Sequence, residues 1–143
     1  MTRVVFDTSV LVAATRSRSG ASFTLVQSIP SQQFEICLSV ALYLEWQDVL
    51  TRPEHLLPGL TVADVLEFVR FLGSVARLQP IYFLWRPYLP DPADDMILEL
   101  ALAAGCRYIV THNVRHFAGS DKLGIEPITP GAFMKLLKED MKS

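Results

Sequence analysis

Four acidic side chains in the sequence stand where a hydrophobic segment begins, ends or is interrupted. They are Asp7, Glu45, Asp91 and Asp95. Asp7, for example, directly follows the apolar run VVF. A carboxylate next to a buried segment is costly unless a counter-charge compensates for it. Carboxylate oxygens are the ligands that Mg²⁺ and Mn²⁺ prefer, so these residues predict a site for a hard divalent cation if folding brings them together.

Hydrolysis of a phosphodiester is the simplest chemistry for such a site. A bound divalent ion lowers the pKa of a water molecule and shields the charge of the phosphate. The sequence has no HExxH zinc motif, no GxSxG turn and no glycine-rich phosphate loop. Its histidines, His55, His112 and His116, are not spaced as zinc ligands. These absences leave metal-assisted hydrolysis as the favoured reaction.

Two of the acids also have structural interpretations. Asp7 could cap a helix that starts near Ser9, although Thr8 and Ser9 are themselves good caps. Glu45 could lie on an exposed helical face, but it shares a helical stripe with Leu42 and Val49. We therefore favour a metal-binding role for both carboxylates.

The segment DPADD contains three acids that differ in their expected roles. Asp91 as N-cap, Pro92 as the first helical residue and Asp94 at the third position form a capping arrangement. Asp95 is left over, on the helical face of Leu98. We expect Asp95 to be the third ligand, Asp91 to be a secondary candidate, and Asp94 to be mostly structural.

The order of the elements predicts an α/β fold with a mostly parallel central sheet. Strands are expected over 3–7, 34–38, 107–111 and 125–128, with a less regular candidate at 78–84. Helices are expected over 10–15, from Gly20 onward, and over 40–51, 62–76, 94–104 and 131–138. In such sheets ligands bind beyond the carboxyl ends of the strands, which is where Asp7 and Thr111 stand.

Length and composition predict one cytoplasmic domain over residues 1–143. Half of the 143 residues are hydrophobic, yet no stretch is long and apolar enough to span a membrane and no signal peptide is evident. Cys37 and Cys106 lie in apolar segments and are expected to be buried, reduced thiols. The aromatic segment 81–89 (IYFLWRPYL) could be a covering loop or a surface for a partner.

The net charge of −2 is unusual for a protein that binds nucleic acid. Setting aside the five acids of the candidate metal region (Asp7, Glu45, Asp91, Asp94 and Asp95) leaves 13 basic and 10 acidic side chains, a remainder of +3. Arg16 and Arg115 are then candidates for contact with an RNA backbone, although scattered solvated charges remain the simpler interpretation of each one.

Several segments together resemble PIN-domain ribonucleases. They are VVFDTSVL at 4–11, Glu45 in its helix, DPADD with LELALAAG, YIVTHN, and GIEPITPGAF. The resemblance spans nearly the whole chain and is strongest to the VapC-type toxins of bacterial toxin–antitoxin pairs. It implies a three-layer α/β/α fold, a Mg²⁺- or Mn²⁺-dependent endoribonuclease, a homodimer and a cognate antitoxin that inhibits it.

The resemblance also assigns roles to individual residues. Asp7, Glu45 and Asp95 match the principal acids of the family, and Thr8 or Ser9 together with Thr111 match its supporting hydroxyls. Many members carry a fourth acid where this chain has Asn113. An amide oxygen can ligate magnesium or orient a water, but it removes one negative charge. Active, one-metal and impaired versions of the site all stay open.

Two other functions stay open beside catalysis on RNA. A catalytically impaired PIN-like module would use the same crevice to bind RNA or a protein partner. A phosphohydrolase of the haloacid-dehalogenase type also places an Asp after its first strand. That class needs a second Asp two residues later, where this chain has Ser9.

Overall fold

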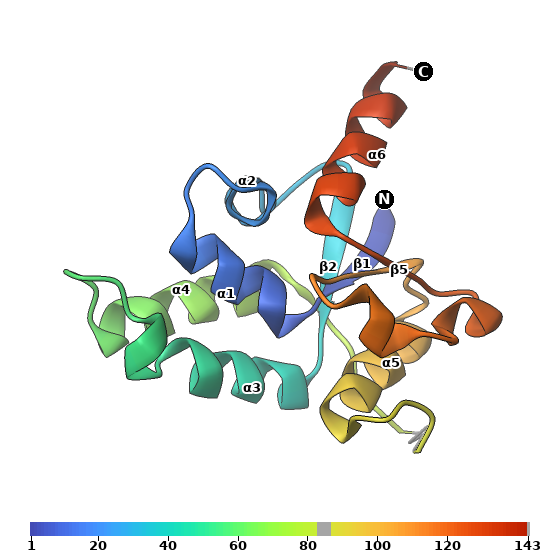
Figure 1. Cartoon of the computed structure of the whole chain (residues 1–143), viewed down its shortest axis with the longest axis horizontal. Coiled ribbons are helices and arrows are strands. Elements are labelled where there is room, and N and C mark those ends of the chain that lie inside the picture. Colours follow the sequence, from blue (N-terminus) through green and yellow to red (C-terminus); the bar gives the residue numbers. More distant parts are fainter. Residues whose placement is uncertain (83–86, 143) are drawn as a thin grey trace.

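The computed structural model describes residues 1–82 and 87–142. Its strands are β1 (Thr2–Phe6), β2 (Phe34–Leu38), β3 (Arg77–Leu78), β4 (Tyr108–Val110) and β5 (Glu126–Ile128). Its α-helices are α1 (Thr8–Arg16), α2 (Ala21–Gln27), α3 (Val40–Leu50), α4 (Val62–Val75), α5 (Pro92–Ala104) and α6 (Pro130–Lys142) (Figure 1). Short 3₁₀ turns cover Pro53–His55, Val114–Phe117 and Ser120–Leu123.

The strands form one parallel sheet in the order β3-β2-β1-β4-β5. The chain builds the sheet outward from β1 in one direction through β2 and β3, and then in the other through β4 and β5. The order therefore reverses between β1 and β4, which is the place where open parallel sheets form a ligand crevice. The predicted α/β class with a parallel sheet is confirmed.

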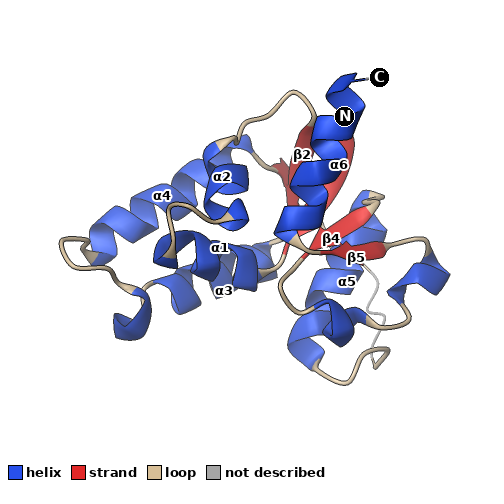
Figure 2. Ribbon diagram, turned by 45° about the horizontal axis from the view of Figure 1, so that its top comes forward, coloured by secondary structure: helices blue, strands red, loops and turns tan. Residues whose placement is uncertain are grey.

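Helices cover both faces of this sheet, which makes the three-layer α/β/α arrangement (Figures 1 and 2). One face packs on α6 through an aromatic cluster in which Phe133 meets Phe34 edge-on, with ring centroids 5.4 Å apart. The opposite face packs under α5, where the Arg3 guanidinium donates to the Ala104 carbonyl at 3.0 Å. The strand residues Val4, Val5 and Phe6 between these layers are fully buried.

Local chemistry explains where several helices begin and end. The Ser39 hydroxyl accepts from the Leu42 amide and caps α3. Thr61 and Asp64 form a reciprocal capping box at the start of α4. Gly105 ends α5 in the left-handed conformation, with φ of 67°. These boundaries follow from the sequence as predicted.

Two predicted elements differ in the structure. The first helix starts at Thr8 instead of Val10, and the Ser9 hydroxyl bonds to a carboxylate instead of capping the helix. The strand predicted over 78–84 is only the two residues Arg77–Leu78, because Pro80 has no amide hydrogen to extend the ladder. Residues 83 and 84 of that prediction lie outside the described residues.

The aromatic segment 81–89 is only partly described, since 83–86 fall outside the described residues. On either side of the gap, Tyr82 is exposed and Leu89 is buried in the core. Cys37 and Cys106 are buried free thiols, as predicted. Among the described helices, none has the length and apolar character that crossing a membrane requires.

Candidate active site

Asp7 stands at the point where the order of the sheet reverses. It follows β1, and its amide donates to the Val110 carbonyl of β4 at 2.9 Å. Its side chain is only 7% exposed, and Oδ2 accepts from the Ser9 hydroxyl at 2.8 Å and from the Thr111 hydroxyl at 2.7 Å. Asp7 occupies the N-cap position of α1 but makes no capping hydrogen bond with its side chain. The carboxylate is thus fixed by neighbouring hydroxyls and does not serve as a cap.

Thr111 joins this carboxylate to the loop after β4. Its hydroxyl is fully buried, lies 3.5 Å from the Ser9 hydroxyl and accepts from the Asn113 amide at 2.9 Å. The His112 amide donates to the Ser9 hydroxyl at 3.1 Å. This network sets the position of the Asn113 backbone relative to Asp7. The Asn113 side chain carries the only neutral amide among the site residues that we predicted.

Glu45 reaches the same region from α3. The Thr8 hydroxyl, next to Asp7 in the chain, donates to Glu45 Oε2. Glu45 is half-buried, and Trp46 beside it is fully buried and anchors that face of α3 in the core. Glu45 is thus joined to the residue that follows Asp7, which brings α3 to the end of β1.

Asp94 is the acid of α5 on which the charges of this pair act. Its pKa is raised to about 6, first by burial and then by the negative charges of Asp91, Asp7 and Glu45, while His116 acts to lower it. His116 Nδ1 lies 3.7 Å from Asp94 Oδ2. Only 13% of the Asp94 side chain is exposed. The negative charges of Asp7 and Glu45 therefore reach Asp94 and disfavour its ionised form.

Asp95 has a different environment from that of its neighbour. It is 2% exposed, and its Oδ1 accepts from the Leu89 amide at 2.8 Å and from the Tyr88 amide at 3.4 Å. These bonds tie the segment before α5 to the helix. The metal role predicted for Asp95 stays a prediction, since the observed contacts of this carboxylate are with the backbone.

Of the remaining predicted residues, Asp91 and Arg115 lie at a cavity near the start of α5, and Arg16 lies elsewhere. Asp91 caps α5 by accepting from the Ala93 amide at 2.9 Å, as its structural interpretation predicts. Asp91, Asp94, Arg115 and His116 line a cavity of about 460 Å³ beside the acids. Arg16 is exposed in the last turn of α1, at the opposite end of that helix from Asp7. Arg115 is therefore the better placed of the two predicted RNA-binding arginines.

The donor set fits a hard divalent cation, although the carboxylates are not drawn together as a cage. Within the described ranges, no three histidine, cysteine or acidic side chains are close enough to ligate one ion. Asp7, Glu45 and Asp94 supply anionic oxygens that repel one another, and a cation removes that repulsion.

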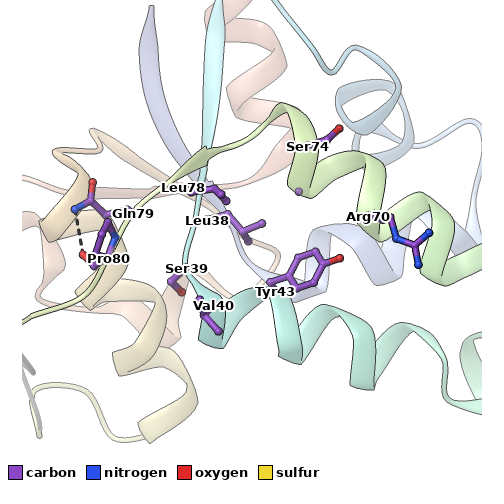
Figure 3. Close-up of a pocket in the computed structure, with 10 residues that line it drawn as sticks. Leu38, Ser39, Val40, Tyr43, Arg70, Ser74, Leu78, Gln79 and Pro80 are labelled. Carbon is purple, nitrogen blue, oxygen red and sulfur yellow. Dashed lines mark hydrogen bonds between the residues drawn. The ribbon is translucent and has the colours of Figure 1, made fainter.

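A second cavity, larger than the one beside Asp94, lies away from these acids (Figure 3). It is an apolar groove of about 620 Å³ between α3, α4 and the edge strand β3. Figure 3 shows Leu38 and Leu78 at its base, with Tyr43 and Arg70 along the helical walls. Tyr43 and Glu45 are two residues apart on α3 and therefore face nearly opposite directions. The apolar lining does not suit an ion, so this groove is not the candidate active site.

Asp94 is the residue that sequence reasoning assigned to structure and that the fold places beside the other acids. Its helical stripe includes Ile97 and Ala101, which are almost fully buried, whereas the stripe of Asp95 ends at the half-buried Leu102. Both acids precede apolar stripes, so the sequence alone does not choose between them. The capping pattern DPAD favoured a structural role for Asp94, because a third-position acid has a ready structural explanation.

Comparison with known proteins agrees with this geometry. Residues 3–115 match the family model of the PIN domain, so the match includes every acid discussed above. No curated protein matches the chain. PIN domains are generally nucleases that act on RNA, and they typically use divalent metal ions. With a match over most of its length and a parallel sheet that brings acids to its reversal point, the chain belongs to the PIN-domain family.

Proposed function

We propose that this protein is a Mg²⁺- or Mn²⁺-dependent endoribonuclease. The observation that carries the proposal is that Thr111, after β4, fixes Asp7 at the carboxyl end of β1, next to the Thr8–Glu45 hydrogen bond and within reach of the Asp94 charge. Negative charges collected in a partly buried crevice are unfavourable by themselves, and such perturbed groups are common at functional sites. Membership of the PIN-domain family supports the same reaction class.

Asp7, Glu45 and Asp94 would hold the ion. When bound, the ion lowers the pKa of a water molecule and shields the phosphate during in-line attack. Thr111 and Ser9 hold Asp7 in one orientation, because both hydroxyls donate to the same oxygen. Such supporting hydrogen bonds orient metal-ligating carboxylates in other proteins.

The loop after β4 supplies the polar groups on the other side of the crevice. Asn113 offers an amide oxygen that can orient a water, and Arg115 lies close enough to the cavity to contact a phosphate. We assign Asp95 mainly to holding the Tyr88–Leu89 backbone, with Asp91 as the cap of α5. This assignment replaces Asp95 with Asp94 as the third ligand.

The finer biological role that we propose is the toxin of a type II toxin–antitoxin pair in the cytoplasm, acting as a homodimer inhibited by its antitoxin. The support is the resemblance of the ordered sequence motifs to VapC-type toxins. Induced expression of the wild type should arrest bacterial growth, and Asp7→Asn should not. Normal growth with well-expressed, folded wild-type protein would contradict the toxin role.

A catalytically impaired module that binds RNA or a protein is the second candidate. It is favoured by the neutral Asn113 and by the lack of a preformed ion cage among the described residues. In that case substitution of Asp7 would leave biological activity intact, whereas the nuclease proposal requires its loss.

Cleavage of a mixed RNA pool tests the proposed reaction. Wild type with Mg²⁺ or Mn²⁺ should cleave RNA, and both a chelator and Asp7→Asn should abolish cleavage. Glu67→Gln is a matched control, because Glu67 is an exposed acid on α4, outside the crevice. Equal cleavage by wild type and Asp7→Asn would contradict the proposal and would indicate a contaminating nuclease.

A further inference from the structure

Another cavity lies between α2 and α6, apart from the acidic crevice. It measures about 350 Å³ and is lined by Ser19, Ala21, Thr24, Gly131, Met134, Lys135 and Lys138. Its polar groups are two hydroxyls and two ammonium groups. A side chain at Gly131 would meet nothing within 4 Å, so this end of the cavity is open. A cavity with this lining suits an anion that solvent can reach.

This cavity is connected to the candidate active site through one side-chain contact. The buried Ser22 hydroxyl lies 2.7 Å from His112 Nε2. Ser22 follows the lining residue Ala21, and His112 follows Thr111, which binds Asp7. Figures 1 and 2 show α2 and α6 side by side on the same face of the sheet. Helix α2, which lines the cavity, is thus tied to the loop that holds Asp7.

The charges of the two regions are opposite. Lys135 and Lys138 are exposed on α6 and line the cavity. Arg18 is also exposed and immediately precedes the lining residue Ser19. The crevice itself repels a polyanion, since it collects the charges of Asp7, Glu45 and Asp94. An RNA strand would thus gain favourable electrostatic energy beside the crevice and not within it.

We propose that the cavity between α2 and α6 is a phosphate-binding subsite for single-stranded RNA next to the cleaved bond. Lys135 and Lys138 contact the backbone there. This inference rests on the proposed ribonuclease function and adds the surface that holds the substrate. Contacts to the backbone alone carry no base information, so the subsite strengthens binding to all sequences equally.

Binding of a labelled single-stranded RNA of about 20 nucleotides, longer than a typical single-strand site, tests the subsite. Fluorescence anisotropy is measured in a chelator, so that the RNA is not cut. The test variant is Lys135→Glu with Lys138→Glu. The control is Arg70→Glu with Arg77→Glu, which makes the same charge change on exposed residues beside the apolar groove.

The expected result is a weaker dependence of binding on salt for the test variant only. Loss of two phosphate contacts lowers the single-strand salt slope by about 1.4, so wild type should lose about sevenfold more affinity than the variant between 50 and 200 mM salt. Lys135→Arg with Lys138→Arg should restore binding. Equal salt slopes for the two charge-reversed variants would overturn the inference, as would binding of an acidic peptide but not RNA by wild type.

Cleavage kinetics separate this inference from the proposed function. With Mg²⁺ or Mn²⁺, the test variant should raise KM for the long RNA and leave kcat unchanged, because the lysines do not touch the reacting atoms. If wild type binds RNA through the lysines but does not cleave it, the proposed ribonuclease function is refuted and the proposed subsite is supported. Cleavage by wild type with no effect of the lysines on KM or binding would refute the subsite alone.

Discussion

The carboxylate of Asp94 has a pKa of about 6 because burial and the charges of Asp91, Asp7 and Glu45 disfavour its ionised form. The ion pair with His116 offsets only part of this effect. Ionised Asp94 is therefore in an unfavourable state near neutral pH unless a cation is bound. Its neighbour Asp95 instead accepts backbone hydrogen bonds, which favour folding.

This contrast predicts different effects of substitution at the two positions. Asp94→Asn should lower RNA cleavage by at least about 100-fold, since even residues that only orient metal ligands contribute about 10- to 100-fold. Asp95→Ala should lower the free energy of unfolding by about 1–3 kcal/mol, because it leaves the Leu89 amide buried without an acceptor. Cleavage assays and urea denaturation measure the two effects. Loss of cleavage in the Asp95 variant, with normal cleavage by Asp94→Asn, would indicate that Asp95 is the ligand.

The raised pKa of Asp94 also predicts how the stability of the metal-free protein depends on pH. The folded protein holds a proton on Asp94 more tightly than the unfolded chain does. The stabilisation that comes from protonated Asp94 is therefore fully present below pH 3.8, the ordinary pKa of an aspartate side chain. It is lost as the pH rises through about 6, the pKa of Asp94 in the folded protein. Near neutral pH, Asp94→Asn should stabilise the metal-free protein by about 1–3 kcal/mol. Urea denaturation with a chelator measures this difference, which should vanish near pH 3. A destabilised variant at neutral pH would contradict the assignment.

At the scale of elements, capping chemistry sets helix boundaries independently of the active site. Thr61 and Asp64 exchange hydrogen bonds at the start of α4, and the same bonds lower the pKa of Asp64. Thr61→Ala should reduce the free energy of unfolding by about 1 kcal/mol. Cleavage of RNA should be unchanged at a temperature where the variant is folded, because α4 contributes no acid to the crevice. Reduced kcat in folded Thr61→Ala would indicate coupling between α4 and the site.

The sequence predicts helix ends of this kind. It does not predict which side of a helix packs against the sheet. Ser39, Thr61 and Gly105 mark helix ends through contacts within a few residues. The choice between Asp94 and Asp95 depends on how α5 is rotated against the sheet, and both acids precede apolar stripes. The cavity between α2 and α6 likewise depends on contacts between distant segments.

At the scale of the whole molecule, the reversal of strand order determines where the chemistry lies. Because β1 and β4 are neighbours, Asp7 and Thr111 meet although 104 residues separate them in the chain. The sequence could predict that both follow strands, but only the observed order makes those strands adjacent. Helix α3 then brings Glu45 to Thr8, beside Asp7, and α5 places Asp94 within reach of the charges of both acids.

The central claim is that Asp7, Glu45 and Asp94 together bind a divalent cation. Calorimetric titration of the protein with Mn²⁺ near neutral pH tests it most directly, with Asp95→Asn as the matched control one residue away. We predict that wild type and Asp95→Asn bind Mn²⁺ with similar affinity and that Asp94→Asn binds at least about tenfold more weakly. Equal affinity of wild type and Asp94→Asn for Mn²⁺ would contradict this account.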